Sequence, residues 1–395
     1  MDRTGKIILV VSVLAMIFGM PLAMRLGLIN MSPADNNATG TNQVTQTGTP
    51  QVPVTGTTAP VVDPTNLPTI STNTPVATNQ PAPSVVEVPA VEESTLTLSS
   101  GKAKFTFTSL GGGVKQVDLL SYPKEIGEDA ASAPVALKNS GKLLPLLALQ
   151  PNIGKAEHEP GSPRPYQTNA IPHELEQVDD RTVRATANFP GGMEVVKTFR
   201  LKKDYQLEAE VVLRNASGAF MKESGFYLVS GSVAEPESTS RMMGMNFGLM
   251  WFDGEEAVSV GPGWFQNYRM GCMCFGSKGE RNNYTQGQGN VAWAGAYSRF
   301  FAQVTMPEKP GQMLVAHQLL VPTQEKPNRK AFEIALVWDA PSLGVGESAT
   351  NRFTLYSGPR EFDRLESIGL EHGNQLEGIM DFGGWFGWVA KGLMM

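Results

Sequence analysis

Cysteine is nearly absent from this sequence, which has Cys272 and Cys274 among its 395 residues. A disulfide scaffold is therefore excluded, and the folded part must rely on an ordinary hydrophobic core. A bridge between cysteines two residues apart in a strand would be strained, and two thiols alone do not complete a tetrahedral zinc site. We interpret both as structural or incidental thiols, and the sequence predicts no metal site and no cofactor.

Basic residues form no stripe along the chain, and the formal net charge is −6. Nucleic acid is excluded as a partner, because no surface of clustered lysine and arginine is available to neutralise phosphates. Lysine and arginine are missing altogether between Arg25 and Lys102. Since translocated segments of membrane proteins are poor in both residues, we expect the part that follows Arg25 to be exported.

Charge is also missing from residues 7–24, an apolar run bracketed by Arg3, Lys6 and Arg25. As a helix this run would span about 27 Å, close to the thickness of a hydrocarbon core. A cleaved signal peptide is the alternative, but residues 21–25 make a poor cleavage site. The sequence therefore predicts a retained transmembrane anchor in residues 1–30, with its N-terminus in the cytoplasm.

Residues 31–94 contain no phenylalanine, tryptophan or tyrosine and are rich in threonine, proline and asparagine. Such a composition cannot bury enough apolar surface to offset the entropy lost on ordering. We interpret this stretch as a disordered linker that tethers a folded domain to the membrane.

Alternation of apolar and polar residues dominates residues 95–358, where we predict a large antiparallel β-supersandwich. The clearest hairpin joins residues 193–201 to residues 205–213, and the second strand places Tyr205, Leu207 and Val211 on one face. Further strands are expected at 104–108, 114–119, 226–229, 256–260, 291–305, 313–321, 332–338 and 352–356, with residues 143–149 as a buried or edge strand. The glycines at 111–113 are interpreted as a turn, since no helix or Lys-Ser/Thr pair follows to make a phosphate loop.

Two residue groups raise the possibility of site chemistry. A copper site is conceivable among the methionines at 242, 243, 245, 250, 270 and 273, but no histidine occurs among them and we favour an adaptable apolar surface or core. His317 is the one histidine expected in a structured strand, with Glu333 as its conceivable acid–base partner. We interpret His317 as an ordinary sheet residue, and the sequence predicts no catalytic residue.

The pattern changes to helical near the C-terminus. Residues 359–373 are predicted to form an amphipathic helix with Phe362, Leu365 and Ile368 on one stripe. Residues 378–395 are predicted to begin an interfacial helix. Its membrane-interface residues are Trp385, Phe386, Trp388 and Lys391, because aromatic and basic side chains beside short apolar runs suit a membrane surface.

Several short motifs, in this order, resemble the N-terminal part of the bacterial YidC membrane protein insertases with a large periplasmic domain. They lie at 109–114 (SLGGGV), 122–125 (YPKE), 197–205 (KTF through KDY), 293–302 (WA through FFA), 356–359 (YSGP) and 381–386 (DFGGWF). The match covers nearly everything outside the linker.

The resemblance implies an inner-membrane protein with one N-terminal span, a periplasmic β-supersandwich similar to galactose-mutarotase folds and a short C-terminal helical segment. Its partners would be inner-membrane lipid and nascent membrane proteins, with contact to the Sec translocon left open. In the family, five further helices form the insertase core, which contains a membrane-embedded arginine in a hydrophilic groove. This sequence ends before those five helices. The resemblance therefore implies a periplasmic accessory domain without the catalytic core, as a fragment, an incomplete product or a variant whose core is supplied elsewhere. The alternative is an exported carbohydrate-binding or mutarotase-like module.

Overall fold

A computed structural model of the chain describes residues 92–124, 133–139, 141–151, 170–222, 224–236, 246–266 and 281–381. The described residues belong to one compact unit that covers Val85–Met395. The predicted anchor (1–30) and most of the predicted linker lie outside them, as do Cys272, Cys274 and residues 382–395. No helix in the described ranges is long and apolar enough to cross a membrane.

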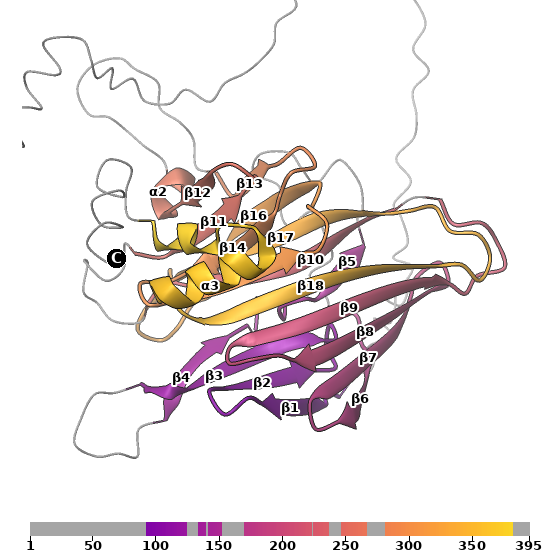
Figure 1. Cartoon of the computed structure of the whole chain (residues 1–395), viewed down its shortest axis with the longest axis horizontal. Coiled ribbons are helices and arrows are strands. Elements are labelled where there is room, and N and C mark those ends of the chain that lie inside the picture. The colour runs from indigo at the N-terminus through magenta and orange to yellow at the C-terminus, as the bar shows by residue number, and fades with distance from the viewer. Residues whose placement is uncertain are drawn as a thin grey trace, which may run out of the picture. The chain divides into compact units, whose positions relative to one another are not determined.

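Three antiparallel sheets make up the unit (Figure 1). The four-stranded sheet follows the chain in order and consists of β1 (Thr95–Ser99), β2 (Ala103–Thr108), β3 (Gly113–Pro123) and β4 (Pro134–Lys138). The five-stranded sheet has the order β13 (Asn283–Gln286), β16 (Met313–Leu320), β17 (Lys330–Ala340), β10 (Ser224–Ala234) and β5 (Leu149–Pro151).

The third sheet has nine strands and joins the other two into one sandwich. Its order is β12 (Ala257–Val260), β11 (Gly248–Phe252), β14 (Trp293–Tyr297), β15 (Phe301–Pro307), β18 (Ser348–Pro359), β9 (Gln206–Asn215), β8 (Met193–Leu201), β7 (Thr182–Phe189) and β6 (Glu174–Asp179). The helical segments in the described ranges are α2 (Pro262–Phe265), α3 (Phe362–His372) and the 3-10 helix η2 (Leu376–Met380). The antiparallel, mostly β class predicted from the sequence is confirmed.

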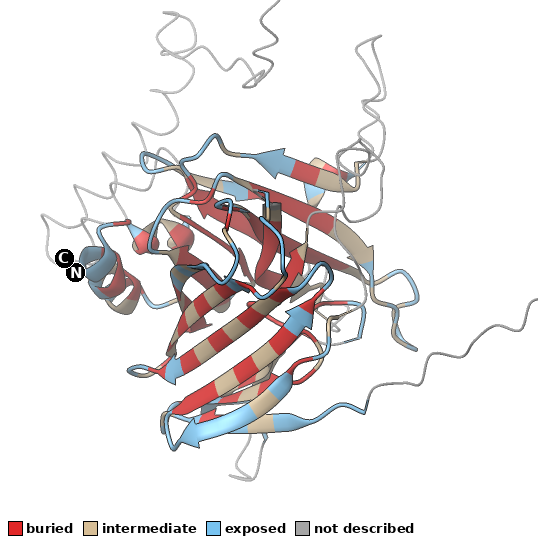
Figure 2. Cartoon of the chain, turned by 90° about the vertical axis from the view of Figure 1, so that its right-hand side faces the viewer, coloured by how far each residue is buried: buried red, intermediate tan, exposed pale blue. Residues whose placement is uncertain are grey.

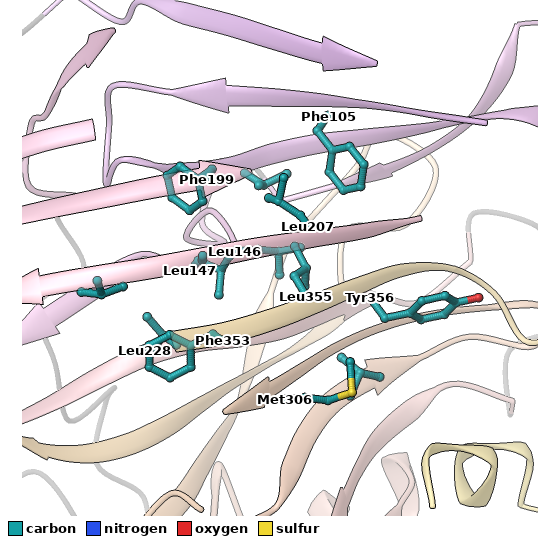
Figure 3. Close-up of a cluster of buried hydrophobic side chains, with 14 of the residues drawn as sticks. Phe105, Leu146, Leu147, Phe199, Leu207, Leu228, Met306, Phe353, Leu355 and Tyr356 are labelled. Carbon is teal, nitrogen blue, oxygen red and sulfur yellow. The ribbon is translucent and has the colours of Figure 1, made fainter. Parts of the chain in front are cut away.

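The nine-stranded sheet buries its two ends against different partners. Strands β7–β9 share one hydrophobic core with the four-stranded sheet, in which Phe105 and Phe199 are fully buried (Figure 3). Strands β11 and β14 share a second core with β16 and β17 of the five-stranded sheet. Figure 2 shows buried residues alternating with more exposed ones along the strands, as expected where one face of a sheet meets a core.

The predicted hairpin is confirmed as β8 and β9, and Tyr205, Leu207 and Val211 are all at most 2% exposed. Strand β17, at the predicted strand 332–338, is buried on both faces along most of its length, as is typical of a strand between two layers. The stripe of Phe362, Leu365 and Ile368 is buried on α3.

Three expectations need correction. Residues 143–148 form a buried irregular segment rather than a strand, because Pro145 has no N–H to pair and Leu147 adopts a left-handed φ of 63°. The predicted strand at 291–305 is two strands, β14 and β15, joined by a turn in which Ser298 N donates to Phe301 O. Strand β3 continues through Pro123, beyond the predicted end at residue 119.

Candidate functional site

A groove of about 850 Å³ runs along β4, the edge strand of the four-stranded sheet. One wall consists of β4 together with Gln116 and Asp118 of β3. The opposite wall consists of residues 232–234 at the end of β10 and residues 296–303 around the β14–β15 turn. The groove therefore lies where all three sheets meet, which makes it the principal candidate for a binding site.

The groove combines an apolar lining with a basic rim. Its apolar side chains include Val135, Leu137, Leu143, Phe301 and Val321. Its charged side chains are four basic residues and one acidic residue, namely Lys104, Lys124, Lys138, Arg329 and Asp118. Since the whole chain carries a net negative charge, this local excess of positive charge distinguishes the groove from the rest of the molecule.

A buried polar network lies beside the groove, next to its lining residue Ser232. Asn139 Oδ1 accepts a hydrogen bond from Ser232 Oγ, and Thr305 Oγ1 donates to Ser230 O at 3.0 Å. Gly231 lies between these contacts, and a Cβ there would come within 2.6 Å of Ala296 N. The absence of a side chain at Gly231 therefore lets β10 approach β14 closely.

Gln303 also lines the groove and is 4% exposed. Its Oε1 accepts from Ser232 N at 3.4 Å, whereas its Nε2 has no acceptor among the described residues. Since Nε2 is buried, the side chain of Gln303 serves to hold β15 against β10 rather than to present a donor to the groove.

Arg360, two residues before α3, contacts the groove-lining residues Tyr297 and Ser298. The guanidinium lies over the ring of Tyr297, 4.9 Å from its centroid, and Nη1 donates to Ser298 O at 3.0 Å. A second donor, Nη2, reaches Ile379 O in η2. Arg360 therefore connects the wall of the groove to both C-terminal helical segments.

A second cation, Arg364, attaches α3 to the β8–β9 turn. Its Nη1 lies 2.6 Å from Asp204 Oδ2, and its Nε donates to Glu361 Oε2 at 3.0 Å. Asp204 also pairs with Lys102 at 3.2 Å, and Glu361 accepts from the hydroxyl of Tyr122. Strands β2 and β3, the central hairpin and α3 are thus joined by one charged network.

The carboxylates of this network titrate below their ordinary ranges. Burial alone would raise the pKa of Asp204, but the hydrogen bonds from Arg364 and Lys102 outweigh it and lower the pKa. The hydrogen bond from Tyr122, together with that from Arg364, lowers the pKa of Glu361 against the effect of burial. Both groups are therefore ionised at neutral pH, which keeps the attachment of α3 intact.

The sequence-predicted pair of His317 and Glu333 is brought together, because the two residues are register partners on β16 and β17. His317 Nδ1 lies 2.6 Å from Asn283 Oδ1, and Glu333 Oε2 accepts from Leu144 N at 2.7 Å. Both side chains are buried, at 2% and 0% exposure, and neither lines the groove. The interpretation of His317 as a sheet residue held in the interior is consistent with this placement.

The predicted membrane-interface residues Trp385, Phe386, Trp388 and Lys391 lie outside the described residues, and so do all of the grouped methionines except Met250. Met250 is buried in the core as part of β11. In the ranges that the structure describes, no group of three or more histidine, cysteine, aspartate or glutamate side chains is arranged to hold a metal ion.

Sequence reasoning missed the groove and the buried Lys197. The groove could not be found because β4 has no clear alternation and its walls come from distant segments. Lys197 did carry a signal, since it occupies the inward position between Val195 and Phe199 in the alternating strand β8.

Comparison with known proteins identifies relatives of this chain. Residues 95–395 match the family model of the YidC periplasmic domain. The membrane protein insertase YidC of Nitrosomonas eutropha is 22% identical over 291 residues, which cover 72% of this chain and 42% of that protein. The YidC of Bordetella avium is also 22% identical, over 73% of this chain and 47% of that protein. The chain thus spans less than half the length of these curated relatives.

Solved structures with a related strand arrangement include a putative aldose 1-epimerase from Escherichia coli K12, with 11% identity and a TM-score of 0.39. A galactose mutarotase-like protein from Lactobacillus casei has 13% identity and a TM-score of 0.40. Each alignment covers 67% of this chain and at least 99% of the other. These similarities concern the fold and carry no argument about activity.

Proposed function

This chain belongs to the YidC periplasmic domain family, and we propose that it serves as the periplasmic accessory domain of a YidC-type insertase, aiding the insertion and folding of inner-membrane proteins. The observation that carries the proposal is the family match over residues 95–395, together with two curated relatives named membrane protein insertase YidC. The insertion activity itself would belong to an insertase core.

We further propose that the domain is held at the inner membrane from both ends of its sequence. The apolar run at residues 7–24 would anchor the N-terminal side, and Trp385, Phe386, Trp388 and Lys391 would lie at the membrane interface on the C-terminal side. The contacts of Arg360 and Arg364 support this arrangement, because they fasten α3 and η2, the segments that lead to the interface residues, onto the sandwich.

The groove beside β4 is the surface that we propose for contact with a client protein. Its lining residue Tyr297 lies under the guanidinium of Arg360, just before α3, so the groove would lie close to the membrane-directed segment. Client segments that emerge on the periplasmic side would meet this surface early.

An enzymatic role is the competing proposal, and the placement of His317 and Glu333 argues against it. A mutarotase needs its acid and base on opposite sides of a bound sugar, whereas these two side chains are buried away from the groove. We therefore propose a non-enzymatic binding domain. Binding of glucose or galactose to the purified chain, with anomer interconversion above the uncatalysed rate, would support the enzyme instead.

The accessory role can be tested by reconstitution. The insertase core of the Nitrosomonas eutropha relative, without its own periplasmic domain, is placed in proteoliposomes with or without this chain. A client with one span and a translocated segment of about 40 residues is then added, and its protease-protected fraction is measured. We expect the full chain to raise that fraction over core alone. An equal yield with and without the chain would contradict the proposal.

A further inference from the structure

The backbone of β4 presents unpaired hydrogen-bonding groups to the groove. Asn139 N donates to Lys115 O at 2.8 Å, and Lys124 N donates to Ala133 O at 2.9 Å, so residues 133 and 139 direct their backbone groups toward β3. Because this direction alternates along an antiparallel strand, residues 135 and 137 also face β3. The N–H and C=O groups of Ala136 and Lys138 therefore point away from β3, toward the groove.

No other strand in the described ranges pairs with this edge of β4. Exposed strand edges are usually blunted or covered, since they recruit other chains. In β4 the open edge instead lines a groove that has an apolar floor and lies next to the proposed membrane-directed helix. This is the geometry in which an extended peptide adds a strand to an existing sheet.

The charge around this edge selects among possible peptides. The ammonium groups of Lys104, Lys124 and Lys138 are exposed, and no ion pair links any of the three to a carboxylate within the described ranges. Asp118, the sole acidic residue of the lining, accepts a hydrogen bond from Gln116 Nε2 at 2.6 Å. An extended segment that carries aspartate or glutamate would therefore be favoured over one that carries lysine or arginine.

We propose that β4 binds an extended, acidic, lysine- and arginine-free polypeptide segment as an added strand, the occupant being a translocated stretch of a client membrane protein. The identity of the client rests on the proposed function, whereas the binding mode rests on the β4 edge and the basic rim. Translocated stretches are poor in lysine and arginine, and residues 26–101 of this chain, which we propose to be translocated, contain neither.

The test uses the full chain in detergent and two labelled nine-residue peptides that alternate valine with either glutamate or lysine. Binding is measured by fluorescence anisotropy at two salt concentrations, and amide hydrogen exchange is measured by NMR or mass spectrometry. We expect the glutamate peptide to bind at least about tenfold more tightly than the lysine peptide, with weaker binding at higher salt. We also expect the amides of Ala136 and Lys138 to become protected on binding.

Variants separate strand addition from simple charge attraction. Ala136→Pro removes one groove-facing N–H, and Pro134 shows that β4 tolerates proline at an equivalent position two residues earlier. Ala136→Ser keeps the N–H and serves as its matched control. We expect Ala136→Pro, but not Ala136→Ser, to abolish protection of Lys138 and to weaken binding roughly tenfold. Circular dichroism and the melting temperature establish that both variants fold.

Charge is tested with Lys104→Glu combined with Lys138→Glu, against Lys309→Glu, an exposed cation that does not line the groove. The double variant should bind the glutamate peptide at least about tenfold more weakly, and the control should bind within about twofold of the parent. Binding without protection of the β4 amides overturns strand addition, and equal binding of the two peptides overturns the charge preference. Absence of peptide binding overturns the inference, whereas the reconstitution result decides the accessory role separately.

Discussion

Lys197 places a primary amine in the hydrophobic core beneath the four-stranded sheet. Its Nζ donates to Gly111 O at 2.7 Å and to Leu147 O at 3.1 Å. Both acceptors belong to left-handed residues, with φ of 87° and 63°, where the chain turns and ladder pairing is interrupted. The buried lysine thus satisfies two carbonyls that no neighbouring strand reaches.

This burial makes the stability of the domain depend on pH in the alkaline range. Loss of solvation lowers the pKa of Lys197 from 10.5 to about 7. Between these two values the unfolded state binds more protons than the folded state, so the free energy of unfolding rises with pH and levels off below about 7. We expect a rise of roughly 1 kcal/mol per pH unit between pH 7.5 and 9.

The Lys197→Met variant isolates this contribution. It removes the titrating amine and leaves two carbonyls unpaired, a cost that does not vary with pH. The free energy of unfolding of parent and variant is measured with guanidinium at pH 7.5, 8.25 and 9. The value for the parent minus the value for the variant should increase with pH. If the two pH profiles run parallel, Lys197 stays protonated in the folded core and its pKa is not lowered.

His173 lies beside the same lysine, where Gly112 gives it room. Burial, with a smaller effect of Lys197, lowers the pKa of His173 to about 3, and its Nδ1 interacts with Ile171 O at 2.7 Å. The imidazole is therefore neutral at neutral pH. A Cβ on Gly112 would come within 2.4 Å of the imidazole ring, so this turn requires glycine for close packing as well as for its φ of 53°.

We expect Gly112→Ala to destabilise the domain more than Gly101→Ala does. Both glycines have a positive φ, but a Cβ on Gly101 would meet nothing within 4 Å. The control variant Gly101→Ala should therefore cost only backbone strain of about 1 kcal/mol. Gly112→Ala should cost that strain and an additional overpacking term of roughly 1–3 kcal/mol. Thermal or guanidinium unfolding measures the difference, and equal costs would show that His173 moves aside freely.

At the scale of elements, α3 is the segment whose attachment can be tested by itself. Its apolar stripe packs on the sandwich, and Arg364 joins it to Asp204 while lying over the ring of Tyr205 at 5.1 Å. The pair is about three-quarters buried, so it should contribute more than an exposed ion pair.

We expect Arg364→Ala to loosen α3 while the sheets remain folded. Amide exchange in residues 362–372 should accelerate at least about tenfold, whereas exchange in β8 and β9 should stay within about twofold of the parent. The matched control is Arg352→Ala, which removes a more exposed arginine paired with Glu210 at 2.9 Å and should leave α3 unchanged. Unchanged exchange in α3 of Arg364→Ala would mean that the apolar stripe alone holds the helix.

The same attachment should weaken in acid. Asp204 and Glu361 have lowered pKa values in the folded state, so the stability they contribute is present above their ordinary values of 3.8 and 4.5 and is lost as the pH falls through the folded values. The protection factors of α3 amides in the parent, which correct for the pH dependence of intrinsic exchange, should therefore fall below about pH 4, and Arg364→Ala should reduce this pH dependence. A flat profile in the parent would contradict the electrostatic account.

Elements with strong local periodicity could be predicted from the sequence, and elements defined by distant contacts could not. The faces of β9 and α3 follow from the spacing of their apolar residues, so both were predicted correctly. β4 has a proline, three small or apolar residues and a lysine with no clear alternation, and only its pairing with β3 makes it a strand. The groove was therefore invisible in the sequence, because it depends on β4, β10 and the β14–β15 turn meeting in space.

At the scale of the whole molecule, the net charge is negative, yet the groove where the three sheets meet is lined by four basic side chains and one acidic side chain. The neighbouring helix α3 is fixed to that groove by Arg360 and leads to the predicted membrane-interface residues. Family membership, the attachment of α3 to the sandwich and the open edge of β4 together support one role. The domain would be attached at the periplasmic surface of the inner membrane and would bind translocated segments of client proteins.

Site-specific photo-crosslinking tests this role most directly. A photoreactive phenylalanine analogue replaces either Val135 in the groove or Val178, which is 43% exposed on the edge strand β6. Each version of the full chain is combined with a relative's insertase core during insertion of a client that has an acidic translocated segment. We expect adducts between position 135 and that segment, and none from position 178. Insertion without adducts at position 135, or with equal adducts at both positions, would contradict the account.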